Sequence, residues 1–438
     1  MVDLRFKAVL IVFLILCLHP LSFTQNVVDS LVHELSISKS KSSIYNQLAE
    51  ATIEDSLRLS FEYAQSALSA SLKESNENQL GIAWFSIAEV YSYQYELDSA
   101  ILYYEKALPL FKQTGNDYYA SYTLNNLGWI YNIFGKYQMA IEKYIESLNY
   151  LNPDEHKDDL AQVFVNIGNS YHAIGLYQTA INYFHKASSI IKRLDDQSSL
   201  PISFNGLGLA YKFLGNFDSA AYYYNSTLEL DLESGNKYGQ AIDYGNIGAL
   251  YFEWGQYHQA FDFHKLALNI YLKEGNSNDL SIAYNNLGEV HKALNQFDSS
   301  LIYLNLALEI DKQNGLEQNM AVRYQNIGDI YFDQKAYIKA MFYYDRSLQM
   351  NKEIGSQYNI ANNLKSIARV NQETGNLSQA EQLYNESLKI ARQINSKALI
   401  KSILESMVLF YEKSGQYEKA LRYHKKVDVL NDSLFREK

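Results

Sequence analysis

The chain has 438 residues, and 47% of them are hydrophobic, so it can form two or three compact domains or one long repeat array. Its formal net charge is −11, and the sequence has no basic stripe with interleaved aromatic residues. Because affinity for nucleic acids comes mostly from Lys and Arg, this balance argues against a nucleic-acid partner.

Residues 1–24 are typical of a secretory signal peptide. Arg5 and Lys7 form a short basic region, residues 8–18 are apolar, and small residues precede Gln25. The apolar run is too short to span a membrane comfortably. We therefore expect residues 1–24 to be removed by cleavage near Thr24–Gln25, and the protein to be exported to the periplasm or another extracytoplasmic compartment. The alternative is an uncleaved N-terminal anchor.

The single cysteine, Cys17, lies inside this apolar run, and Leu16 before it disfavours lipidation. Cleavage would leave a chain without cysteine. Such a chain has no disulfide, no thiol nucleophile and no zinc site ligated by cysteine, so packing alone must stabilise it.

Residues 25–76 carry a degenerate copy of a pattern that becomes regular further on. Over residues 77–436 the pattern recurs nine times at a constant interval, with equivalent positions 40 apart in the numbering. A small residue marks each of the first eight repeats, a Tyr usually follows three places later, and an Ala or Ser follows twelve places later. The small residues are Ala88, Gly128, Gly168, Gly208, Gly248, Gly288, Gly328 and Ala368, and the ninth repeat has Val408.

Each repeat contains two helical patterns. In the repeat at residues 237–276, apolar spacing predicts one helix at about 237–254 and a second at about 257–273. Gly255 lies between them, and a glycine just past a helix end can take the left-handed conformation that ends the helix. Its equivalents are Gly135, Gly175, Gly215, Gly375 and Gly415, with Asn295 and Lys335 as exceptions, and a second set follows the second helix at Gly115, Gly235, Gly275, Gly315 and Gly355.

Gly248 lies inside the first helix of its repeat, where glycine costs roughly 0.5–1 kcal/mol relative to alanine. We interpret it as the point where the two helices of a repeat cross, with Ala260 opposite and Tyr251 leaning over the gap. The missing side chain would let the two backbones approach closely, and that packing would offset the cost.

The pattern resembles the tetratricopeptide repeat over residues 77–436, with a weaker copy at 37–76. The resemblance implies an all-α, right-handed superhelical solenoid of antiparallel helix pairs, with the first helices lining a concave groove. It also implies binding of a peptide or protein partner, without catalysis or a cofactor. The period is 40 instead of 34 and the terminal Pro is missing, as in the longer-repeat subgroup. One repeat supplies Tyr244, Ile247, Gly248, Tyr251, Ala260, His264 and Ala267.

Asparagines recur beside the repeat glycine, at positions that face the groove in this family. An Asn side chain offers two donors and an acceptor, so a ladder of them could bind an extended peptide backbone. The alternative is that they bridge adjacent first helices, and the two roles are compatible. The series two residues before the glycine is Asn126, Asn166, Asn246, Asn286 and Asn326, and the series one place earlier is Asn125, Asn205 and Asn285.

Catalytic and metal-binding motifs are missing from the sequence, which has no His-Glu-x-x-His, no Walker loop and no Gly-x-Ser-x-Gly. We interpret the nine scattered histidines as packed or partly exposed. The groove positions are neutral to acidic in the middle, which favours a neutral or basic peptide. Carbohydrate binding is an alternative, through tyrosines expected to be exposed, such as Tyr118, Tyr119, Tyr222 and Tyr223.

The last residues, 437–438, follow the final helical pattern directly. This ending resembles secreted bacterial chains in which repeats pass into a linker, a membrane helix and a signalling domain. We therefore expect the sensory or interaction region of a signalling protein, with a membrane-anchored signalling partner or a downstream domain. The alternative is a free periplasmic scaffold without signalling output.

Overall fold

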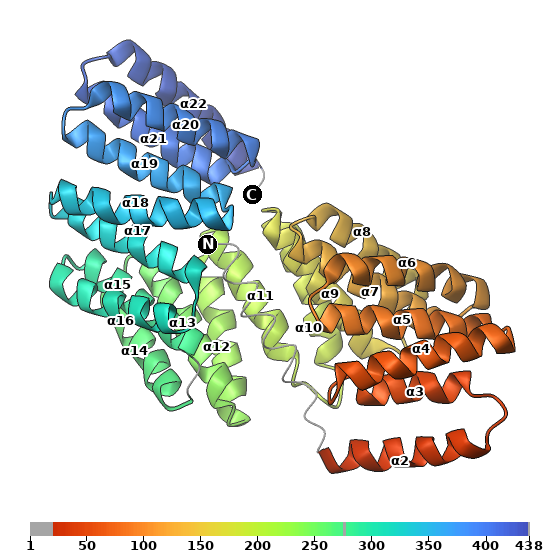
Figure 1. Ribbon diagram of the computed structural model, residues 1–438. Helices are drawn as coiled ribbons and strands as arrows, with labels where there is room; N and C mark the ends of the chain where they lie inside the picture. The colour runs from red at the N-terminus through yellow and green to blue at the C-terminus, as the bar shows by residue number, and fades with distance from the viewer. Residues whose placement is uncertain (1–20, 275–276, 437–438) are drawn as a thin grey trace. The chain divides into compact units, whose positions relative to one another are not determined.

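The computed structural model describes residues 21–274 and 277–436 (Figure 1). These residues form 21 α-helices and one short 3-10 helix, with no strand among them, which confirms the predicted all-α fold. None of the described helices combines the length and hydrophobicity that a membrane span requires. Residues 1–20 of the predicted signal peptide, Gly275 and the C-terminal residues 437–438 lie outside the described residues.

The helices run in pairs, and each pair has a first and a second helix. The first helices are α5 (Glu77–Tyr93), α7 (Asp117–Ile133), α9 (Lys157–Ala173), α11 (Leu200–Phe213), α13 (Lys237–Glu253), α15 (Ser277–Ala293), α17 (Glu317–Asp333), α19 (Gln357–Glu373) and α21 (Lys397–Lys413). The second helices are α6 (Leu97–Thr114), α8 (Tyr137–Ser147), α10 (Tyr177–Ile191), α12 (Phe217–Glu233), α14 (Tyr257–Glu274), α16 (Phe297–Gln313), α18 (Tyr337–Ile354), α20 (Leu377–Gln393) and α22 (Tyr417–Arg436).

Three helices precede these pairs. They are α2 (Leu21–Ile37), α3 (Ser42–Thr52) and α4 (Leu57–Glu74), and the last two form a further pair. The 3-10 helix, η1 (Leu148–Tyr150), extends α8. The predicted bounds for the repeat at residues 237–276 agree with α13 and α14 to within one residue.

The chain divides into two compact units, Met1–Ala210 (unit 1) and Tyr211–Lys438 (unit 2), each a stack of helix pairs. Within the units, each helix from α2 to α10 and from α12 to α22 packs against the next along the chain. First helices of successive pairs also contact one another, from α13 to α21 in unit 2 and between α7 and α9 in unit 1. The first helices α13, α15, α17, α19 and α21 therefore form a layer in unit 2.

The turn between the two helices of a pair requires a left-handed residue. Gly255 has a φ of +80°, and the next amide, of Gln256, donates to the carbonyl oxygen of Tyr251 at 2.8 Å, which closes the helix end. Asn295 and Lys335, the two exceptions in the sequence pattern, take φ values of +57° and +59° at the same repeat position. The predicted helix stops are thus confirmed among the described residues, and Asn295 and Lys335 keep the left-handed conformation where they replace glycine.

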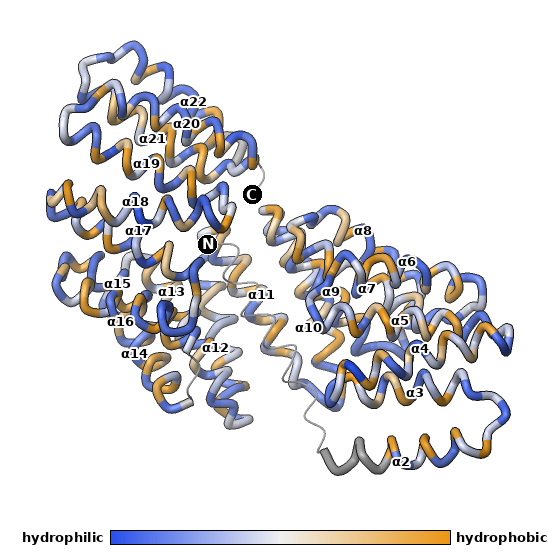
Figure 2. The backbone as a smooth tube through the Cα atoms, in the orientation of Figure 1, coloured by the Kyte–Doolittle hydropathy of each residue, from blue (hydrophilic) through white to orange (hydrophobic). Residues whose placement is uncertain are grey.

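Polar and apolar residues are mixed along the helices (Figure 2), as expected for helices that bury one side. On the second helices, the alanines of the repeat pattern are buried. An aromatic position four residues further on fills the space between the helices of a pair. Its fully buried members include Tyr104, Tyr144, Phe184, Tyr224, Tyr344 and Tyr384.

The repeat glycine lies where the two helices approach closely, as predicted, but its partner differs from the prediction. A Cβ atom placed on Gly248 would lie 2.7 Å from Cε1 of His264, and one on Gly128 would lie 2.6 Å from Cε1 of Tyr144. Ala260 is fully buried one turn before His264. The glycine therefore makes room for the aromatic position of the second helix, because a ring needs more space than alanine does.

Two side chains near this crossing, Tyr251 and His264, show how the space around the glycine is filled. Tyr251 does not cover the glycine but stacks on Phe263, with ring centres 5.4 Å apart. His264 is 3% exposed, and burial lowers its pKa to about 4, so its ring is neutral at neutral pH. This histidine is a packing residue, as the sequence interpretation proposed.

Gly248→Leu should destabilise the protein by about 1–3 kcal/mol, because the new side chain overpacks the contact with His264. Gly245→Ala is the matched control, since a Cβ atom there meets nothing within 4 Å. It should leave stability unchanged or raise it by roughly 0.5–1 kcal/mol. Urea unfolding measures both variants, and equal stability of Gly248→Leu and wild type would refute the close approach.

Candidate functional site

All eight asparagines of the predicted groove lie on first helices, and all are half-buried. Each lies either three or two residues before the repeat glycine. The residue directly after the glycine is three or four positions further on, so it lies beside them on the helix surface. We call the surface formed by these three positions the first-helix face of each unit. Asn125, Asn126, Asn166 and Asn205 lie in unit 1, and Asn246, Asn285, Asn286 and Asn326 lie in unit 2.

Two pairs of these asparagines bridge adjacent first helices. The Nδ2 atom of Asn166 donates to Oδ1 of Asn125 at 3.0 Å, which joins α9 to α7. Nδ2 of Asn326 donates to Oδ1 of Asn285 at 2.9 Å, which joins α17 to α15. The bridging role predicted as one alternative therefore exists at both places.

A bridge leaves part of each amide group unused. The side-chain oxygen of Asn285 accepts from Asn326, and both N–H donors of its NH₂ group remain available. Asn326 uses one of its N–H donors in the bridge, and its side-chain oxygen can still accept a hydrogen bond. Asn166 is more fully engaged, because its oxygen also accepts from Nε2 of Gln162 at 3.1 Å. The pair in unit 2 thus presents one donor group and one acceptor beside each other.

Asn126 belongs to a polar cluster that the sequence analysis missed. Its Nδ2 atom donates to Oε1 of Glu89 at 2.7 Å and to the hydroxyl oxygen of Tyr104 at 3.1 Å. The hydroxyl of Tyr104 also donates to Glu89. Burial raises the pKa of Glu89 to about 7, and the hydrogen bonds from Tyr104 and Asn126 oppose that rise.

The same arrangement recurs in unit 2, where the hydroxyl of Tyr344 donates to Oδ1 of Asp329 at 2.7 Å. In both cases an acidic residue follows the repeat small residue directly, and a tyrosine lies fifteen residues later. This recurring pair was the signal in the sequence that could have revealed the cluster. A search for acidic pairs overlooks it, because the partner of the carboxylate is a tyrosine.

Asn286, on α15, makes no hydrogen bond within the described part of the chain. It is half-buried on the first-helix face of unit 2. Its amide group is therefore the one in the predicted ladder that is most clearly available to a partner.

A hollow of about 310 Å³ opens in unit 2 among α17, α18, α19, α20 and α21. Arg369 lies on its wall with the guanidinium carbon 4.2 Å from the centre of the Phe332 ring, a cation–π contact. Ser406, which occupies the repeat position of the asparagine series, also lines the hollow. This hollow therefore includes part of the first-helix face.

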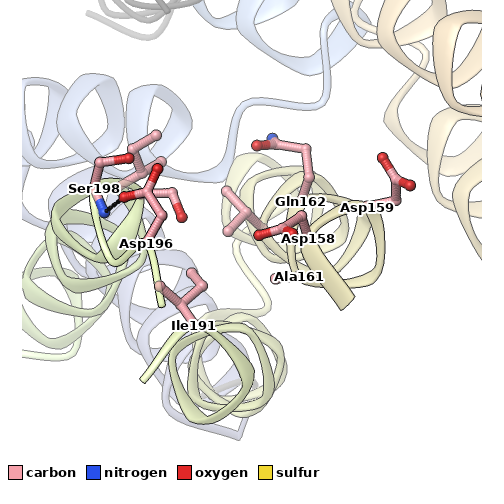
Figure 3. Close-up of a pocket in the computed structure, with 10 residues that line it drawn as sticks. Asp158, Asp159, Ala161, Gln162, Ile191, Asp196 and Ser198 are labelled. Atoms are coloured by element: carbon pink, nitrogen blue, oxygen red, sulfur yellow. Dashed lines mark hydrogen bonds between the residues drawn. The ribbon is translucent and has the colours of Figure 1, made fainter. Parts of the chain in front are cut away.

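A second hollow, of about 240 Å³, lies in unit 1 (Figure 3). It forms where α10 ends at Ile191 and residues 192–199 connect it to α11, and Asp158 and Asp159 of α9 lie on the other side. Burial raises the pKa of Asp159, whereas the backbone amide of Ser198 lowers the pKa of Asp196. None of the predicted groove asparagines lines this hollow.

The described residues contain no group of three or more His, Cys, Asp or Glu placed to hold a metal ion. Two of the four tyrosines predicted as exposed are packed instead. Tyr119 stacks on Phe111 with ring centres 5.2 Å apart, and Tyr223 stacks on Tyr211 at 5.6 Å. Tyr118 and Tyr222 are exposed as expected. Neighbouring residues on a helix point in different directions, so only one of each pair reaches solvent.

Glu89→Gln should remove a pH dependence of stability. With a pKa of about 7 in the folded protein against an ordinary value of 4.5, Glu89 binds more protons in the folded state, so stability falls as pH rises through this window. The side-chain oxygen of Gln can still accept the hydrogen bonds of Tyr104 and Asn126, but Gln carries no negative charge. Above pH 7 the variant should be more stable than wild type by up to about 3 kcal/mol.

Urea unfolding at about pH 5 and about pH 8 measures this effect. Glu62→Gln, on the exposed surface of α4, is the matched control and should follow wild type. An equal loss of stability in Glu89→Gln and wild type between the two pH values would contradict the assignment.

Solved structures of similar fold cover most of the chain. The apo form of RapI has 18% sequence identity and a TM-score of 0.61, over 81% of this chain and 98% of that chain. A Rap protein complexed with Competence and Sporulation Factor has 13% identity and a TM-score of 0.57, over 82% and 100%. Aspartyl phosphate phosphatase F from Bacillus subtilis has 14% identity and a TM-score of 0.54, over 82% and 94%. At these identities the likeness shows the fold alone.

A comparison with curated proteins gave no match. The sequence model of the tetratricopeptide repeat matches residues 79–152, 159–233, 235–313 and 319–393, together more than half of the chain. The regularly spaced helix pairs and the glycine at six of the nine repeat positions agree with that match. The chain belongs to the tetratricopeptide repeat family.

Proposed function

We propose that the protein is a non-catalytic scaffold that binds an extended peptide or protein segment on the first-helix face. The observation that carries this proposal is the pair Asn285 and Asn326 together with Asn286. The bridge between Asn285 and Asn326 orients both amides and leaves an NH₂ group beside a carbonyl oxygen. An extended peptide backbone offers the complementary C=O and N–H groups, which bind without reading the side chains of the partner.

The bridge also lowers the cost of binding. A free Asn side chain must lose rotamer freedom when it contacts a ligand, whereas Asn285 and Asn326 already hold each other in place. The structural role and the binding role therefore support each other. The Rap protein named above, which shares this fold, was crystallised with Competence and Sporulation Factor, and this supports a partner-binding role.

We infer further that the protein acts outside the cytoplasm, as the interaction region of a signalling system. The support is the signal-peptide pattern of residues 1–24. A free scaffold without signalling output is the alternative. Mass spectrometry of the protein expressed in a bacterium tests export, because the purified chain should begin near Gln25. A chain that retains residues 1–24 in the cytoplasmic fraction would contradict it.

Peptide binding is tested by selection from a library of random peptides displayed on phage, with the purified protein as target. Fluorescence anisotropy then measures the affinity of selected peptides for variants. Asn286→Ala should weaken binding about three- to tenfold, which corresponds to the loss of one hydrogen bond.

Asn305→Ala is the matched control, because Asn305 lies exposed on α16 and donates only to the carbonyl oxygen of Leu301. It should bind like wild type, and Asn286→Ala should keep the wild-type melting temperature. Failure to select any peptide, or equal weakening by both variants, would count against the proposed function.

A further inference from the structure

Glu289 on α15 lacks the hydrogen bonds that equivalent carboxylates receive. Glu89 and Asp329 occupy the same repeat position, and each accepts the hydroxyl of a tyrosine on its second helix. At Glu289 the corresponding second-helix residue is Leu304, a fully buried side chain without a donor. Glu289 therefore keeps the acidic group of the pattern but not its tyrosine.

The asparagine donor is missing as well. Asn126 donates to Glu89, whereas its repeat equivalent Asn326 donates to Asn285. As a result, Oε1 of Glu289 is buried without a hydrogen-bond partner. Buried polar groups in native proteins are nearly always hydrogen-bonded, so an unpartnered carboxylate oxygen needs an explanation.

The nearest cations are already paired. Nζ of Lys292 lies 3.6 Å from Oδ2 of Asp329, and Nε of Arg323 lies 3.1 Å from Oδ2 of Asp311 in a buried ion pair. Asp333 adds a further negative charge near Glu289. Burial raises the pKa of Glu289, Lys292 opposes this, and Asp329 adds to it. The surface between α15 and α17 thus has more acidic than free basic groups.

Asn286 lies one turn before Glu289 on the same helix. Residues three apart on a helix are neighbours on its surface, so the two side chains lie side by side. Asn286 has no hydrogen bond within the described part of the chain, and Glu289 has a buried oxygen without one. The half-buried side chains of Asn286 and Glu289 therefore lie together on the first-helix face of unit 2, without a hydrogen-bond donor among the described residues.

We propose that Glu289 and Asn286 form a subsite for a basic side chain, Lys or Arg, of the bound peptide. This inference rests on the proposed peptide-binding function and adds the chemistry of one partner residue. The ammonium or guanidinium group donates to the carboxylate of Glu289 and to Oδ1 of Asn286. Charge-assisted hydrogen bonds of this kind are stronger than neutral ones, and they supply the missing partner of the carboxylate.

The experiment uses peptides selected from the phage library against wild-type protein. Sequencing should show Lys or Arg enriched at one peptide position. A synthetic peptide with that residue, and its analogue with Gln there, are then measured against wild type, Glu289→Gln and Glu309→Gln. Glu309 is the matched control, since it lies exposed on a second helix, α16, away from the first-helix face.

Glu289→Gln should weaken the basic peptide about tenfold and leave the affinity of the Gln analogue unchanged. Glu309→Gln should bind both peptides like wild type. Selected peptides without a basic position, or an equal effect of Glu289→Gln on both peptides, would overturn the subsite while the proposed peptide binding stands. If no peptide is selected at all, the subsite fails together with the proposed function.

Discussion

The structure depends on the close approach of two helices at a residue without a side chain. Where the crossing residue is glycine, it makes room for a buried side chain of the second helix, as Gly128 does for Tyr144 and Gly248 does for His264. A glycine inside a helix costs stability, and the ring packed against it offsets that cost. Because the same contact recurs at a constant interval along the chain, successive pairs within each unit stack in the same register.

That register also places the polar residues of the candidate site. Residues a fixed distance from the glycine fall at the same point of every first helix, so asparagines from neighbouring repeats come within hydrogen-bond reach. The bridge from Asn326 to Asn285 is a direct product of this spacing. The same spacing places Tyr104 beside Glu89 and Tyr344 beside Asp329. At Glu289 the equivalent position is occupied by Leu304, which has no hydrogen-bond donor.

Much of the fold was predictable because it is periodic. Gly255 and its equivalents marked the turns, and apolar spacing marked α13 and α14 to within one residue. The partner of Gly248 was predicted wrongly, because spacing shows which residues are small but not which neighbouring ring fills the space. The hydrogen bonds of Asn126 were also missed, since they depend on a carboxylate and a tyrosine from other helices.

We propose that the first-helix face holds an extended peptide through oriented amide groups, and a crystal structure of the protein with a selected peptide would test this. We expect an extended peptide against α15 and α17, with backbone groups hydrogen-bonded to Asn285, Asn286 and Asn326. A peptide bound to the second helices, or one held without contact to these amides, would contradict it.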